Sequence, residues 1–255
     1  INTVANINQI TIDSANYNGK EQAVTTDKID LGTLSSDWKK TDFTIGEVKG
    51  DITNVTEDGV TVTLVPTKPG YTGVLTRKYE IKPLKLDGTT NTIADYIKAE
   101  VVNPQVAYTG NAIAPKKTDV KLIDKKTGAD LSGYIASVGT IAKVDAIAGK
   151  SQALEITLNK DTDGAVKNYE ITAPSAKITT ANTLTVTPRD LSTVNIEVPE
   201  LQTNGSTVID TSKVIFTDKT TGDTLTLAGD VSFDSVPNSV GTYEVSAVSY
   251  THLRA

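Results

Sequence analysis

The residues best placed to do chemistry lie in the stretch 159–164, which reads Asn-Lys-Asp-Thr-Asp-Gly, and at Glu170 further along the chain. Their spacing matches a calcium loop, which needs oxygen ligands at its first, third, fifth and twelfth positions and glycine at its sixth. The alternative is a solvated hairpin loop, because strands rather than helices are predicted on both sides. Calcium is the one cofactor that the sequence suggests. The predicted metal ligands are Asn159, Asp161, Asp163 and Glu170.

Two other acidic stretches, 124–128 and 218–222, each begin with aspartate and end with glycine. We interpret them as tight turns, with metal binding as the alternative. Cysteine is absent, and the one histidine, His252, has no surrounding pattern of partners for nucleophilic catalysis. Paired carboxylates for glycoside hydrolysis would need a pocket, for which a small β domain rarely has room. We therefore predict no catalytic residues and no enzyme activity.

The overall charge argues against several classes of partner. The net charge is −6 and the isoelectric point about 4.9, whereas nucleic acids and anionic lipids select basic surfaces. No apolar run is long enough to cross a membrane, so we expect no membrane insertion. Methionine is absent even at position 1, and we expect the sequence to be a piece of a longer chain.

Two markers return about 90 residues later and indicate tandem copies of one unit. Tyr79-Glu80-Ile81 returns at 169–171, and Tyr17-Asn18-Gly19 returns as Tyr108-Thr109-Gly110. A proline, Pro83 or Pro188, closes each complete copy and stiffens the passage to the next. We predict a first repeat over 1–83, a second over 84–188 and a partial third over 189–255. The end of the chain, 250–255, fits no position of the repeat, so we expect the third domain to be incomplete with an unpaired sheet edge.

Short segments of alternating apolar and polar residues predict strands within each repeat. The strongest are a hairpin of 52–56 with 60–64, the strand 153–158, and the segment 214–225, which mirrors 120–131. Helix should make up less than a tenth of the chain, because no long segment has helical periodicity. The prediction is an all-β protein of tandem β-sandwich domains in an elongated array.

The order of these motifs resembles a known family. A Tyr-x-Gly turn, an alternating strand, the Gly-Tyr-Thr-Gly of 70–73, a Lys-Tyr-hydrophobic strand and a proline junction resemble bacterial immunoglobulin-like repeats of the MBG/YDG type. In the second repeat, Asp-Thr-Asp-Gly at 161–164 replaces the Gly-Tyr-Thr-Gly element, and the third repeat matches in its middle only. The resemblance implies secreted, cell-wall-attached stalks or adhesins of Gram-positive bacteria.

Two functions follow from this interpretation. The first is a non-catalytic stalk or spacer on the cell surface, whose partners are the neighbouring repeats of the same chain and which we expect to be monomeric. The alternative is a module that binds carbohydrate or a host surface ligand through Trp38 or loop tyrosines. We expect Trp38 to pack in the core or to be half-buried, and we expect Tyr17 and Tyr71 to cover the ends of the domain. An aromatic-lined groove would favour the binding module over the spacer.

Overall fold

The computed structural model describes residues 8–34, 36–160, 168–200, 208–237, 239–249 and 253–254. Of the described residues, strands account for 37% and helices, including short 3-10 turns, for 11%. The all-β prediction is therefore confirmed, while the helix content lies slightly above the tenth that we expected. No helix in these ranges is both long and apolar enough to span a membrane. The helical segments are α1 (Ile93–Tyr96) and the 3-10 turns η2 (Thr26–Lys28), η3 (Lys40–Asp42), η4 (Lys117–Asp119), η5 (Ser132–Tyr134), η6 (Leu191–Thr193) and η7 (Thr211–Lys213).

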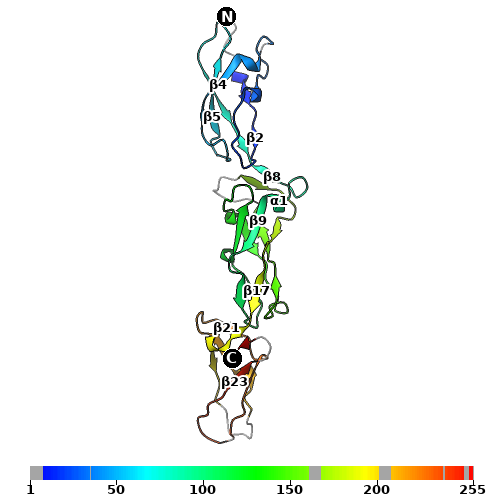
Figure 1. The fold of residues 1–255 in the computed structure, drawn as a ribbon, viewed down its shortest axis with the longest axis vertical. Helices are drawn as coiled ribbons and strands as arrows, with labels where there is room; N and C mark the ends of the chain where they lie inside the picture. The colour runs from blue at the N-terminus through cyan, green and yellow to red at the C-terminus, as the bar shows by residue number, and fades with distance from the viewer. Residues whose placement is uncertain are drawn as a thin grey trace. The chain divides into compact units, whose positions relative to one another are not determined.

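Contacts between residues divide the chain into two compact units. Figure 1 shows the strands and short helices that these units contain. The boundary between the units runs through the predicted second repeat. The predicted junction of the first and second repeats falls inside unit one, and that of the second and third falls inside unit two. The three repeats remain a prediction, and we use their names for the segments 1–83, 84–188 and 189–255. Unit one is Ile1–Ile97, Asp124–Ala129 and Asn159–Ala176, and unit two is Lys98–Ile123, Asp130–Leu158 and Lys177–Ala255.

The largest sheet of the first repeat has the strand order β4-β5-β6 and is antiparallel. Val60, Val62 and Leu64 lie on one face of β5 and are almost fully buried, as alternation in a strand requires. At one end of this sheet β4 and β5 pair as Phe43 opposite Pro66. The strands of the first repeat are β1 (Thr11–Ile12), β2 (Ala15–Asn16), β3 (Ile29–Asp30), β4 (Phe43–Lys49), β5 (Val60–Pro66), β6 (Leu75–Tyr79) and β7 (Ile81–Lys82).

The predicted hairpin of 52–56 with 60–64 is wrong in its first arm. β5 pairs with β4 and β6, and residues 50–59 form the connection between β4 and β5. The Asp51 carboxylate accepts hydrogen bonds from the amides of Thr53 (2.7 Å) and Asn54 (2.9 Å), which fold the start of this connection into a turn. The alternation of β4 is hidden in the sequence because a bulge shifts its register between Ile45 and Val48.

The second repeat contains the three-stranded sheets β12-β14-β16 and β10-β17-β13. Ile156 and Leu158 are buried on one face of β14, so the predicted alternation of 153–158 is confirmed in this strand. β17 runs parallel to β10 and antiparallel to β13. The strands are β8 (Leu84–Leu86), β9 (Ile97–Val101), β10 (Gln105–Ala107), β11 (Val120–Asp124), β12 (Ile135–Val138), β13 (Ser151–Gln152), β14 (Glu155–Leu158), β15 (Tyr169–Ile171), β16 (Lys177–Thr179) and β17 (Leu184–Thr187).

The third repeat has the antiparallel sheet β19-β20-β21 and the pair β22-β23. The expectation that the chain end fits no repeat position is wrong at Leu253–Arg254. These residues form β24, which pairs in parallel with β18 as β15 pairs with β8 in the second repeat. His252 lies outside the described residues. The strands are β18 (Arg189–Asp190), β19 (Val194–Glu197), β20 (Ile215–Asp218), β21 (Thr224–Leu225), β22 (Val231–Phe233), β23 (Ala247–Ser249) and β24 (Leu253–Arg254).

One of the two repeat markers does not mark equivalent positions. Tyr79 ends β6 opposite Val60 of β5, whereas Tyr169 begins β15, which pairs in parallel with β8. Glu80 and Glu170 therefore occupy different places in their repeats. The counterpart of β6 is β16, since β16 pairs with β14 as β6 pairs with β5. The other marker holds: Tyr17 follows β2, which is parallel to β7, and Tyr108 follows β10, which is parallel to β17.

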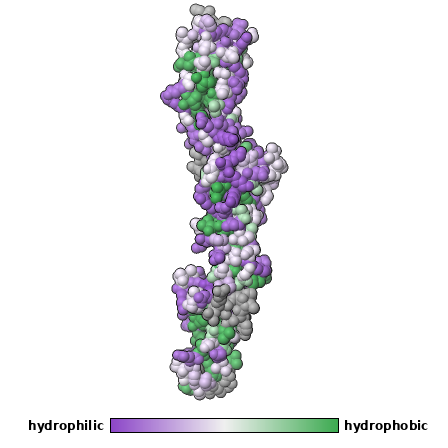
Figure 2. Space-filling view, in the orientation of Figure 1, coloured by the Kyte–Doolittle hydropathy of each residue, from purple (hydrophilic) through white to green (hydrophobic). Residues whose placement is uncertain are grey.

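On the face shown in Figure 2, hydrophobic residues form small patches between hydrophilic ones. The larger apolar side chains that stay exposed include Val74, of which 62% is exposed, and Tyr71, of which 38% is exposed. Both belong to the loop between β5 and β6 in the first repeat.

Candidate functional site

Two clusters of tyrosine and aspartate lie at the predicted junctions between repeats. Joint one is the set of contacts between the turn at Tyr17 and the second repeat, and joint two is the set between the turn at Tyr108 and the third repeat. At both, the tyrosine amide donates to the carbonyl of the residue before the junction proline, Lys82 at 2.8 Å and Thr187 at 2.9 Å. The same backbone bond therefore fixes both Tyr-x-Gly turns.

Asp124 is the centre of joint one and is only 1% exposed. Its Oδ2 accepts hydrogen bonds from the phenols of Tyr17 (3.1 Å) and Tyr169 (3.0 Å). Its Oδ1 accepts the amides of Lys126 (2.7 Å) and Thr127 (3.2 Å) in the turn that Asp124 begins. Four donors thus compensate the burial of this carboxylate, which would otherwise be costly.

The tyrosines of joint one pack as well as donate. The rings of Tyr17 and Tyr169 meet edge to face with their centroids 5.3 Å apart, and Tyr96 lies 6.0 Å from Tyr169. Burial, together with the neighbouring Asp124 carboxylate, raises the pKa of Tyr17 and that of Tyr169 above the usual value for a phenol. Both phenols therefore stay protonated and remain hydrogen-bond donors well above neutral pH.

Asparagines add a second set of bonds at joint one. Asn168 donates through Nδ2 to Asn54 Oδ1 (2.9 Å), and its own Oδ1 accepts the amide of Val55 (2.9 Å). Asn54 and Val55 belong to the β4–β5 connection of the first repeat, and Asn168 directly precedes β15 of the second. The connection that replaces the predicted hairpin arm is therefore part of the joint.

Joint two uses a different aspartate. The Tyr108 phenol donates to Asp230 Oδ2 at 2.9 Å, and burial and this carboxylate raise the pKa of Tyr108 to about 12. Tyr108 and Val186 of the second repeat belong to the same buried apolar cluster as Phe216 and Leu227 of the third. The core of unit two therefore continues across the predicted junction.

Arg189, directly after Pro188, links both sides of joint two. It is 8% exposed, donates through Nε to the Tyr108 carbonyl at 2.9 Å, and forms an ion pair with Asp218. Asp218 also accepts the amides of Thr220 (2.8 Å) and Thr221 (3.0 Å). These amides first, and Arg189 in addition, hold the pKa of Asp218 below its usual value.

The glycine of each Tyr-x-Gly turn lies against the following repeat. Gly19 and Gly110 have φ angles of 75° and 73°, in the region that only glycine adopts without strain. A Cβ at Gly110 would lie 1.8 Å from the carbonyl oxygen of Thr226, and one at Gly19 would lie 3.0 Å from Cβ of Lys126. A side chain at either position would push the two repeats apart.

The turns at 124–128 and 218–222 have the same hydrogen bonds, as the turn interpretation predicts. Gly128 donates to the Asp124 carbonyl (2.8 Å) and Gly222 to the Asp218 carbonyl (2.9 Å). The described part of the chain contains no group of three or more acidic or histidine side chains that could hold a metal ion. The first carboxylate of each turn instead serves a joint.

The predicted calcium ligands are only partly within the described residues. Asp161 and Asp163 lie outside them, and Asn159 directly follows β14. Glu170 lies on β15, and its carboxylate is 3.7 Å from Nζ of Lys85 on the neighbouring β8. A calcium loop over 159–170 therefore stays a prediction, and Glu170 has an ion-pair partner of its own.

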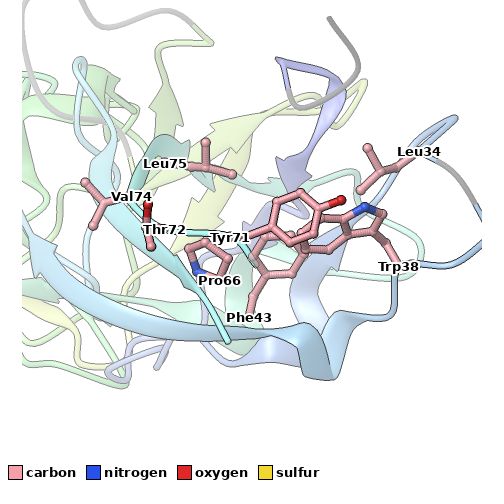
Figure 3. A pocket seen from close by; sticks show the side chains of 9 residues that line it. Leu34, Trp38, Phe43, Pro66, Tyr71, Thr72, Val74 and Leu75 are labelled. Carbon is pink, nitrogen blue, oxygen red and sulfur yellow. The ribbon is translucent and has the colours of Figure 1, made fainter. Parts of the chain in front are cut away.

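Trp38 is half-buried, as expected, and it lines a pocket of about 120 Å³ in the first repeat (Figure 3). Its indole stacks on Phe43 with a centroid separation of 5.2 Å and meets Tyr71 edge-on at 4.6 Å. Lys68 Nζ lies 4.8 Å from the centre of the indole. The remaining lining residues are Leu34, Pro66, Thr72, Gly73, Val74 and Leu75.

No protein-family model matches this chain, and no curated protein matches its sequence. The resemblance to bacterial immunoglobulin-like repeats therefore rests on the short motifs alone.

The sequence points to some residues of the joints and misses others. The Tyr-x-Gly turns are visible as a repeat marker, and Asp124 and Asp218 as turn residues. The hydrogen bond from Tyr108 to Asp230 could not be predicted from the sequence. The acceptor at joint one is Asp124, and its counterpart in the repeat is Asp218 rather than Asp230. The sequence gives one indication of the role of Arg189, which is that this cationic residue directly follows a junction proline.

Proposed function

We propose that this chain is a non-catalytic spacer segment of a bacterial cell-surface protein, made of immunoglobulin-like β-sandwich repeats. The observation that carries the proposal is the recurrence of one joint design. At both predicted junctions a Tyr-x-Gly turn contacts the next repeat. Its phenol donates a hydrogen bond to an aspartate, and its glycine lies against the Lys126 side chain at joint one or the Thr226 backbone at joint two. Such contacts resist bending between repeats, which is what a spacer needs.

Several further features support a mechanical role. Pro83 and Pro188 separate consecutive strands at the junctions, where a fixed φ limits the motion of the chain. The tyrosine, aspartate and arginine side chains of the joints form hydrogen bonds and an ion pair with one another. Such paired groups stabilise a fixed contact between the repeats. An extracellular, cell-wall-associated location and a monomeric state belong to the same proposal.

The alternative function, binding of a carbohydrate or host ligand, is favoured by one observation, the aromatic pocket at Trp38. A sugar platform needs an accessible ring face. The indole of Trp38 already contacts Phe43, Tyr71 and Lys68, so we rank this function second.

Spin-label distances test the stiffness of joint one. The chain has no cysteine, so labels can be attached at Lys49→Cys in the first repeat and Thr89→Cys in the second. We expect a narrow distance distribution that broadens in the Tyr17→Ser variant, while the exposed control Thr76→Ser on β6 leaves it narrow. A broad distribution in the chain with intact Tyr17 would contradict the spacer. Strong binding to a glycan array that is lost in Trp38→Ala would favour the alternative.

A further inference from the structure

The Trp38 pocket lies at the end of the first repeat opposite joint one. Strand register shows this directly. Phe43 pairs with Pro66 and Leu64 with Leu75 at the pocket end of the β4-β5-β6 sheet, whereas Val60 pairs with Tyr79 at the other end. From Tyr79 the chain enters β7, which pairs with β2 and so leads to the Tyr17 turn. The two ends of the first repeat therefore carry different surfaces.

The corresponding end of each later repeat receives a Tyr-x-Gly turn. In the second repeat, the turn Asp124–Ala129 after β11 and the segment after β14 belong to unit one together with the Tyr17 turn. In the third repeat, Asp230 directly precedes β22 and accepts the Tyr108 phenol. In the first repeat, the loop after β3 contains Trp38, the loop after β5 contains Tyr71, and Asp42 directly precedes β4 as Asp230 precedes β22.

From this correspondence we infer that the Trp38 pocket is the receiving half of a further joint, which takes the Tyr-x-Gly turn of another repeat of the same kind. The inference rests on the proposed spacer function, since it extends the joint design to a third position. The occupant is a polypeptide turn that presents a phenol and a glycine. Asp42 directly precedes β4 as Asp230 precedes β22, and its Oδ2 already accepts the amide of Lys39 at 2.8 Å. By this correspondence its carboxylate is the acceptor that we assign to the phenol.

The chemistry of the pocket fits this occupant. At joint one the incoming Tyr17 ring packs edge-on against Tyr169, and the pocket offers the rings of Trp38, Phe43 and Tyr71 gathered on one side, with Val74 on the other (Figure 3). Val74 and Tyr71 are 62% and 38% exposed, so an incoming turn would bury apolar surface of both side chains.

The backbone beside the pocket also leaves room for a turn. Gly70 and Gly73 have positive φ angles of 87° and 101°, and a Cβ at either would have nothing within 4 Å. By contrast, Gly59 at the other end of the sheet has the carbonyl oxygen of Tyr79 3.1 Å from its Cβ position. The loop over 70–73 is therefore open where a second turn would approach.

The single tryptophan of the chain makes the pocket easy to observe, because all tryptophan fluorescence comes from Trp38. The first experiment titrates the full chain with p-cresol, the side-chain analogue of tyrosine. We expect a saturable change in Trp38 emission and in the amide NMR signals of Gly70 and Gly73. The response should weaken severalfold in Val74→Asp and stay unchanged in Val102→Asp, an exposed valine elsewhere. Absence of a saturable response, or an equal response to galactose or N-acetylglucosamine, would overturn the inference.

The second experiment supplies the whole turn. A copy of residues 8–86 with Trp38→Phe is placed before the full chain, so that the downstream Trp38 stays the only tryptophan. We expect acrylamide quenching of Trp38 to fall severalfold, and to return when the added copy carries Gly19→Arg. Equal quenching in both extended chains overturns the assignment of the occupant even if p-cresol binds. The spin-label distances across joint one are measured in the same extended chains. A narrow distribution across joint one together with equal quenching would mean that the assigned occupant is wrong while the spacer function still stands.

Discussion

At the scale of single residues, glycine is the most demanding member of each joint. Gly110 combines a positive φ with a direct approach to the Thr226 carbonyl oxygen. Gly128 has almost the same φ, 75°, but nothing within 4 Å of its Cβ position. A substitution at Gly128 therefore measures the cost of backbone strain alone, whereas one at Gly110 adds the cost of a clash with Thr226.

We predict that Gly110→Ala destabilises the protein clearly more than Gly128→Ala. Alanine in the left-handed region costs about 1–2 kcal/mol at either position. At Gly110 the added methyl group must in addition displace Thr226 and open joint two. Urea unfolding of both variants measures the difference in the free energy of unfolding. Equal losses in the two variants would show that the close approach at Gly110 has no energetic weight.

The raised pKa of Tyr108 makes stability sensitive to alkaline pH. The folded pKa is about 12 and the ordinary value 10.0, so the unfolded chain loses this proton first as the pH rises. The contribution of Tyr108 is therefore complete below pH 10 and declines above it. We predict that the melting temperature falls less steeply between about pH 10 and 12 in Tyr108→Phe than in the natural sequence. Tyr243→Phe, at an exposed tyrosine of the same unit, is the control and should leave the slope unchanged.

At the scale of elements, the sequence predicts the strands that alternate cleanly and misses those that do not. β14 follows its pattern because Ile156 and Leu158 alternate with polar residues. β4 does not, because its bulge places Gly46 and Glu47 together between Ile45 and Val48, and the Asp51 turn removes the apparent first arm of the hairpin. Local composition gives the period of a strand, but the partner of a strand depends on residues far away in the chain.

The candidate site is predictable to a similar degree. Tyr17 and Tyr108 stand out because they recur, and Asp124 because it starts a turn. That Asp124 receives a phenol from a residue 107 positions away follows only from the packing of two repeats. The repeated Tyr-Glu-Ile at 79 and 169 misleads in the other direction, because it predicts equivalent positions where none exist. The tyrosines of the two identical tripeptides lie in strands that have different partners.

The turn between β20 and β21 gives a prediction at this scale. Asp218 has a pKa below its ordinary value of 3.8 because the amides of Thr221 and Thr220, and then Arg189, stabilise its charged form. Its contribution to stability is therefore present above about pH 4 and is lost as the pH falls toward the folded pKa. We predict that Asp218→Asn lowers the melting temperature at pH 7 and flattens its dependence on acidic pH. Asp223→Asn, at an exposed residue next to the same turn, should change neither property, and an equal effect of both substitutions would contradict the role of Asp218.

At the scale of the whole molecule, the two joints use one design with separate sets of residues. Joint one lies in unit one and depends on Asp124, and joint two lies in unit two and depends on Asp230 and Arg189. No hydrogen-bond partner is shared between them among the described residues. A chain of such joints would gain stiffness one junction at a time.

Double-mutant cycles test this independence. Tyr17 and Tyr169 donate to the same oxygen of Asp124, so we predict that Tyr17→Phe and Tyr169→Phe are not additive and that their coupling is about 0.5 kcal/mol or more. The phenols of Tyr17 and Tyr108 donate to different aspartates, Asp124 and Asp230, so the losses from Tyr17→Phe and Tyr108→Phe should add within about 0.5 kcal/mol. Each single substitution should cost about 1.5–3 kcal/mol, because it removes a hydrogen bond to a charged group. Urea unfolding of the natural sequence, the three single variants and the two double variants gives all the terms. Strong coupling between Tyr17 and Tyr108 would mean that the joints act as one cooperative structure, and the stepwise account of stiffness would then have to be abandoned.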